Sequence, residues 1–106
     1  MTLSDAGAQL ERAIRGAFAG FAGAVEVDEV ASRPWVSLTF AGARHRLGVR
    51  IAGQTAGVAA SAFLAGLEER EFALHGHILA DIALVEEVRD GGGARLTLEA
   101  LTVESG

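Results

Sequence analysis

Two histidines in the second half of the chain are the residues best suited to metal chemistry. His75 and His77 are two positions apart, which places both side chains on one face of a β-strand. Asp81 shares that face, and imidazole nitrogens with a carboxylate oxygen are ligands that zinc accepts. At the usual strand rise Asp81 lies about 13 Å from His77, so one ion cannot bind both without a bend. We assign no metal and no other cofactor; the alternative to a ligand site is a polar strand end near an interface.

A strip of basic side chains is the second candidate for binding chemistry. Arg44, Arg46 and Arg50 share one parity, and Trp35 is expected opposite Arg50, where a guanidinium can stack on the indole. Such a strip can bind a phosphate group or an acidic partner. The alternative is that strand arginines keep a sheet edge soluble.

The composition excludes several classes of function. The sequence has no cysteine, so disulfides, thiolate metal sites and cysteine nucleophiles are ruled out. No serine has the context of a nucleophile elbow, and the glycines at 91–93 precede no helix, so they predict a hairpin turn and not a phosphate-binding loop. His45 is expected at a half-buried hairpin tip and not as a catalytic base. The formal charge of −5 argues against nucleic acid or an anionic membrane as a partner.

The same features indicate where the protein works. All nine cationic side chains are arginine, which we attribute to a bacterial genome of high GC content. The first residues lack the pattern of a secretory signal, and no apolar run reaches the roughly 18 residues of a membrane span. We therefore expect a cytoplasmic protein without membrane contact. Its 106 residues suit a single domain, residues 1–106.

Apolar periodicity predicts the elements that position these side chains. Apolar residues recur at three- and four-residue steps between Leu3 and Phe21 and again over 55–70, which predicts two amphipathic helices. Alternation of apolar and polar residues predicts five strands, over 24–30, 35–40, 46–51, 72–88 and 94–104.

Two hairpins are expected to bring the apolar sets into register. A turn at Gly42 and Ala43 pairs Leu38 with Leu47 on one face. A three-residue loop over 91–93 places Leu84 opposite Ala100.

The predicted order is α-β-β-β-α-β-β. It indicates an α+β domain with one antiparallel sheet, or a mixed sheet as the alternative, and two helices packed on one face. This order resembles the secretion-chaperone-like fold, in which a helix, three strands, a helix and two strands precede a final helix. The resemblance is one of topology and does not cover that final helix. It implies a dimeric protein-binding role.

The sheet face away from the helices is expected to be an interface. The run 78–85 is apolar on both parities apart from Asp81, which is typical of a strand covered on both sides. A chain of this length has no third layer, so we expect a second copy to cover the face. The expected dimer face comprises Leu79, Ala83, Val85, Leu101 and Val103.

The sequence thus leads to two functional hypotheses. The first is a non-catalytic interaction module that acts as a homodimer, with another protein as an alternative partner. The second is a ligand- or metal-binding protein, or an enzyme, with its site near His75, His77, Arg46 and Arg50. A monomer with scattered apolar surface residues is the alternative to the dimer.

Overall fold

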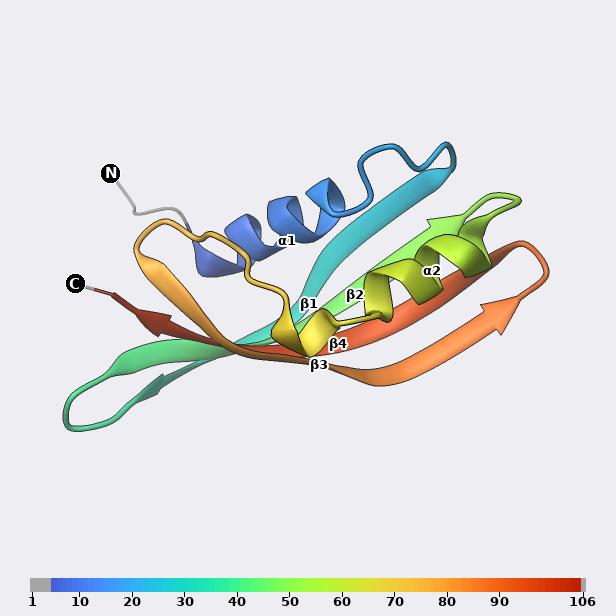
Figure 1. Cartoon of the computed structure of the whole chain (residues 1–106). Helices are drawn as coiled ribbons and strands as arrows, with labels where there is room; N and C mark the ends of the chain where they lie inside the picture. Colours follow the sequence, from blue (N-terminus) through green and yellow to red (C-terminus); the bar gives the residue numbers. More distant parts are fainter. Residues whose placement is uncertain (1–4, 106) are drawn as a thin grey trace.

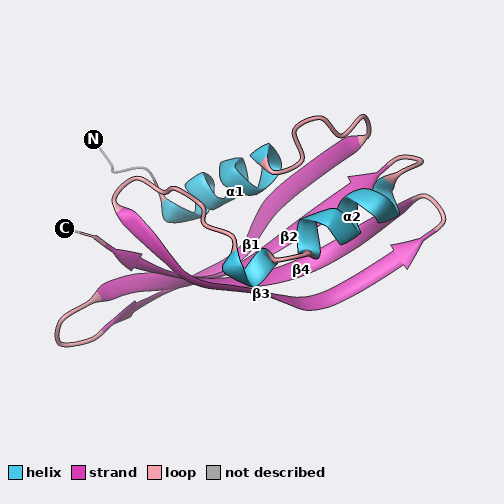
Figure 2. Cartoon of the chain, in the orientation of Figure 1, coloured by secondary structure: helices cyan, strands magenta, loops and turns pink. Residues whose placement is uncertain are grey.

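The chain folds as an antiparallel sheet with two helices on one face. The computed structural model describes residues 5–105, so Leu3 lies outside the described part. The strands pair antiparallel in the order β1-β2-β4-β3, and both helices cover the same face of the sheet (Figures 1 and 2). The elements are α1 (Ala6–Gly16), β1 (Ala24–Val36), β2 (Ala41–Ala52), α2 (Ala56–Leu64), the short 3-10 helix η1 (Leu67–Glu69), β3 (His77–Asp90) and β4 (Gly93–Glu104). The predicted α+β class and the helix layer are confirmed.

The core lies between the helices and the two central strands. Alternate residues of β2 and β4 point toward the helices, and Leu47, Val49 and Leu98 are completely buried there. Burying each such side chain contributes about 1.5–3 kcal/mol to the free energy of folding. Phe18, just beyond α1, stacks on Phe63 of α2 with ring centroids 4.8 Å apart, so the turn that follows α1 packs against α2.

Both helices end earlier than the periodicity predicts. The first helix ends at Gly16, and the residues up to Phe21 form a turn in place of the predicted helix. Phe18 and Phe21 nevertheless pack on the core. The expected helix over 55–70 stops at Leu64 because Gly66 adopts the left-handed conformation, with φ at 71°. Among residues 5–105, neither helix has the length and apolar character needed to cross a membrane.

The first hairpin differs from the prediction in strand number and register. Residues 24–36 form one strand and not two, so the sheet has four strands where five were expected. The turn covers 37–40, and its backbone is closed by hydrogen bonds between Ser37 and Phe40. The supposed break around Pro34 is an edge strand, where proline's missing N–H costs no ladder bond. His45 consequently pairs with Ser32 and not with Phe40, and the element order no longer matches the secretion-chaperone-like fold.

The second hairpin is also shifted. The strand expected over 72–88 begins at His77, and its pairing with β4 is irregular at Ala80 and Val85. Each bulge adds one residue to β3 and reverses the alternation that follows. The loop holds two residues, Gly91 and Gly92, and not the three that were expected, because Asp90 pairs with Gly93. The shorter loop and the bulge at Val85 together place Leu84 opposite Leu98, and not opposite Ala100 as predicted.

The molecule is elongated, with extents of 47 × 25 × 23 Å. Figure 1 shows that the end of the β1–β2 hairpin, around the turn at residues 37–40, extends past the helices; we call this end the arm. Three apolar side chains on this arm are well exposed, namely Val36, Leu38 and Phe40.

Candidate functional site

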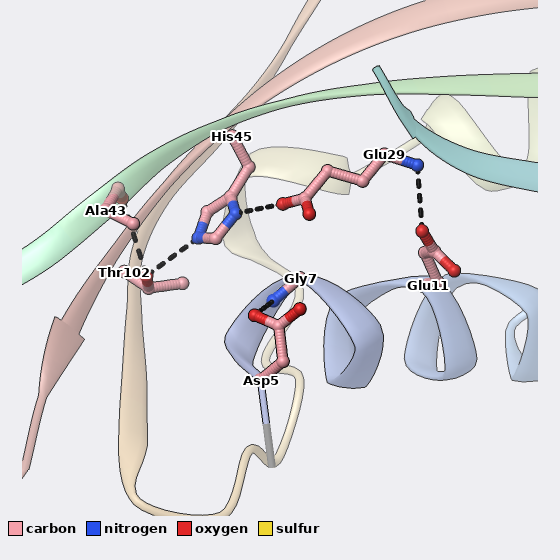
Figure 3. A network of polar contacts seen from close by, with 7 residues as sticks. All are labelled: Asp5, Gly7, Glu11, Glu29, Ala43, His45 and Thr102. Carbon is pink, nitrogen blue, oxygen red and sulfur yellow. Dashed lines mark hydrogen bonds and ion pairs between the residues drawn. The ribbon is translucent and has the colours of Figure 1, made fainter. Parts of the chain in front are cut away.

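A buried polar network links β1, β2 and β4 beneath α1 (Figure 3). The Nδ1 atom of His45 lies 2.6 Å from a carboxylate oxygen of Glu29, and its Nε2 atom lies 2.9 Å from the hydroxyl oxygen of Thr102. The same hydroxyl reaches the carbonyl oxygen of Ala43 at 3.4 Å. Because a carboxylate only accepts hydrogen bonds, Nδ1 carries a proton and Nε2 bonds to the hydroxyl.

Glu29 is held in this position by α1. Its backbone N–H donates to a carboxylate oxygen of Glu11 at 2.8 Å, at the point where Val30 bulges out of the ladder with β2. A Cβ atom on Gly7 would overlap the Glu29 carboxylate, so a larger residue here would force that carboxylate to move. Asp5 caps the helix by accepting a hydrogen bond from the Gly7 N–H (Figure 3).

Thr102, His45 and Glu29 form a chain of hydroxyl, imidazole and carboxylate. The same three groups, in the same order, form the catalytic triad of hydrolases that use a serine nucleophile. A nucleophile must be open to its substrate, whereas Thr102 has no exposed surface and the His45 side chain is 1% exposed. The network therefore satisfies polar groups inside the fold. The prediction that His45 is a half-buried tip residue was wrong, because the shifted hairpin places it in the middle of β2.

The two histidines of the proposed ligand site are not on one strand face. His77 is the first residue of β3, whereas His75 lies in the preceding loop, separated from it by Gly76 with φ at 78°. The Gln9 side chain bonds both backbone groups of His75, the N–H at 2.5 Å and the carbonyl at 2.8 Å. Within residues 5–105, no three His, Cys, Asp or Glu side chains are arranged to hold a metal ion.

The predicted basic strip is largely neutralised within the chain. On the outer face, meaning the sheet face opposite the helices, Arg46 pairs with Glu99 at 2.6 Å. Arg50 pairs with Glu26 at 2.5 Å and lies 3.7 Å from Asp28. Trp35 lies opposite Gly42, so the predicted stacking on Arg50 was wrong.

A different pair of arginines on the outer face lacks such partners. Arg33 and Arg44 are directly opposite each other on β1 and β2, and neither forms an ion pair with any described residue. Like charges in this position repel each other and destabilise the strand pair. Arg33 is not among the predicted site residues, because the segment around Pro34 was expected to be a break between strands, whereas it continues β1.

The two arginines belong to a row that crosses the whole sheet. Residues opposite one another on successive strands are Arg33, Arg44, Leu101 and Asp81, in the order β1, β2, β4, β3. Asp81 forms no ion pair among the described residues. The twisted sheet makes a groove of about 380 Å³ here, with Arg33, Arg44, Arg46, Asp81, Glu99 and Leu101 in its lining. Positive charge lies along the β1 side of this groove and negative charge along the β3 side.

The residues of the expected dimer face are divided by the β3 bulges. Ala83, Leu101 and Val103 lie on the outer face, in register with Glu99, Arg44 and Gly42. Leu79 pairs with Thr102 and packs against the core on the helix side. Val85 is the bulged residue and is 49% exposed.

Comparison with known proteins adds no family to this description. No protein-family model matches the sequence, and no curated protein is significantly similar to it. The groove on the outer face is therefore the candidate functional site on its geometry and charge alone.

Proposed function

We propose that the protein is a non-catalytic interaction module that binds carboxylate groups of a partner protein in the groove of its outer face. The observation that carries this proposal is the unpaired couple Arg33 and Arg44. Two guanidinium groups on one face can each bind a carboxylate with two parallel hydrogen bonds. An incoming carboxylate would also remove the repulsion between the two arginines.

An acidic peptide suits this groove better than nucleic acid. Binding of a phosphate backbone depends on many cationic contacts along its length. Within the described part of the chain, the groove has two arginines without ion pairs, and Glu26 and Asp28 lie further along β1. A cytoplasmic location, supported by the absence of cysteine, is part of the proposal.

Trp35, the single tryptophan of the chain, provides the test. It lies on β1 two residues from Arg33, and its emission should report occupation of the groove. Titration with hexaglutamate peptide should change this emission in a saturable way that weakens with added salt, because exposed charge pairs are screened. Replacing both arginines (Arg33→Gln with Arg44→Gln) should weaken binding about tenfold or more, as expected when charge-assisted hydrogen bonds are lost.

The control is Arg12→Gln. Arg12 is exposed on α1, away from the outer face, and removal of its charge should leave the titration unchanged. The proposal is wrong if hexaglutamate causes no saturable change, or if the double variant and the control bind it equally well.

A further inference from the structure

We infer that the partner in the groove is a second copy of this chain, packed face to face about a two-fold axis parallel to the strands. Arg33 of one protomer then meets Asp81 of the partner subunit. This inference rests on the proposed function, since it names the molecule that supplies the carboxylate. It follows from how charge is distributed over three neighbouring rows of the outer face.

The row through Arg33 has opposite charges at its two ends. Arg33 is on edge strand β1 and Asp81 is on edge strand β3, three strand spacings or about 14 Å apart. That separation prevents an ion pair within one chain. A two-fold axis parallel to the strands places β1 of one copy over β3 of the other, so each arginine faces an aspartate and the contact forms twice.

The two adjacent rows are complementary under the same operation. Toward the arm, the row Trp35, Gly42, Val103 and Ile78 places the indole over Ile78 of the partner subunit, a side chain that is 56% exposed in the single chain. On the other side, the row Ala31, Arg46, Glu99 and Ala83 sets Arg46 over Glu99 of the partner subunit and alanine over alanine. In these three rows the edge-strand positions meet an opposite charge or an apolar side chain, whereas Arg44 lies over Leu101 of the partner subunit and gains no carboxylate.

The charges also exclude the other simple arrangement. An axis across the strands through this row would place Arg33 over Arg33 of the partner subunit, which is repulsive. The complementarity ends at the next row, where the parallel axis would bring Asp28 over Glu86 of the partner subunit; one row further it would bring Arg50 over Arg95 of the partner subunit. The interface is therefore confined to the half of the face nearest the arm. Aligned packing of two sheets, with strand directions within about 30° of each other, has this geometry.

Charge reversal in the full chain tests both the dimer and its register. Sedimentation equilibrium should show a dimer for the natural sequence. Arg33→Asp and Asp81→Arg should each raise the dimer dissociation constant about tenfold or more, because two attractive contacts become repulsive. The double variant should restore the dimer, since the two opposite charges meet again across the axis. Arg12→Asp makes the same change of charge on α1 and should leave the dissociation constant unchanged.

Three results would overturn the inference. These are a monomer at all concentrations, a dimer unaffected by either single reversal, and a dimer weakened by both but not restored in the double variant. Urea unfolding of the same variants separates loss of the dimer from loss of the fold. A monomeric protein that still binds hexaglutamate through Arg33 and Arg44 would refute the second copy as partner and leave the proposed function standing.

Discussion

His45 shows, at the scale of single residues, how burial decides what a set of polar groups does. Its two ring nitrogens contact Glu29 and Thr102, so the side chain has no unused hydrogen-bonding group. The same three groups at a surface would be a candidate for nucleophilic catalysis. Here they are enclosed by the helix layer, and their hydrogen bonds offset the cost of burying an imidazole.

The Thr102 hydroxyl should therefore contribute to stability. Thr102→Val keeps the volume but leaves the Nε2 atom of His45 buried without a partner, which should lower the free energy of unfolding by about 1–3 kcal/mol. Thr97→Val is the matched control on the same strand, because Thr97 lies on the outer face and its change should stay within about 0.5 kcal/mol. Urea unfolding measures both values. Equal stability of the two variants would show that the hydroxyl bond to His45 is not needed.

The residues of the groove show which features of the outer face can be predicted from the alternation of apolar and polar residues along a strand. The sequence pattern placed Arg44, Leu101 and Asp81 on one face, and the structure places them in one row. Arg33 was not predicted there because residues 31–34 were expected to be a break between strands, whereas they continue β1 beyond the Val30 bulge. The pattern also could not reveal that Arg46 and Arg50 are engaged by Glu99 and Glu26, because those contacts depend on which strands are neighbours.

At the scale of elements, the close approach of α1 to β1 depends on one small residue. Gly7→Ala would push the new methyl group into the Glu29 carboxylate, and that carboxylate cannot move without releasing His45. We expect this variant to unfold about 1–3 kcal/mol more easily, as in other overpacked sites. Gly16→Ala is the matched control in the same helix, because nothing lies within 4 Å of its added methyl group.

The control should instead gain stability. Alanine favours a helix over glycine by up to about 1 kcal/mol, so the two variants should shift the urea midpoint in opposite directions. A stabilised Gly7→Ala protein would mean that Glu29 has room to move, and that the helix does not fix the polar network.

Regular helices and strands could be predicted from this sequence, whereas the β-bulges in the edge strands could not. The two helices and the buried residues of β2 and β4 follow from apolar periodicity, because these segments are regular. The bulges at Val30, Ala80 and Val85 do not, since each adds one residue and reverses the faces beyond it. Leu79 was predicted on the outer face and lies on the helix side for this reason, whereas Leu84 keeps its predicted face and changes only its partner.

At the scale of the whole molecule, one face of the sheet is covered and the other is not. The helix layer covers the inner side of β2 and β4. Among residues 5–105, the outer face keeps an arginine couple and an aspartate without ion pairs, and the exposed side chain of Ile78 near the arm. Separating opposite charges across a sheet weakens the single chain, because neither end gains a partner. The same separation favours association, which is why we assign binding to this face.

Arginine-selective labelling is the most direct test of that claim, at a protein concentration below the dissociation constant of the inferred dimer so that the groove is free. Phenylglyoxal modification, followed by mass spectrometry of peptides, reports the accessibility of Arg33, Arg44 and Arg12 in one sample. Added hexaglutamate should slow the modification of Arg33 and Arg44 severalfold and leave Arg12 unchanged. Equal slowing at all three positions, or no slowing at Arg33 and Arg44, would contradict a binding groove on the outer face.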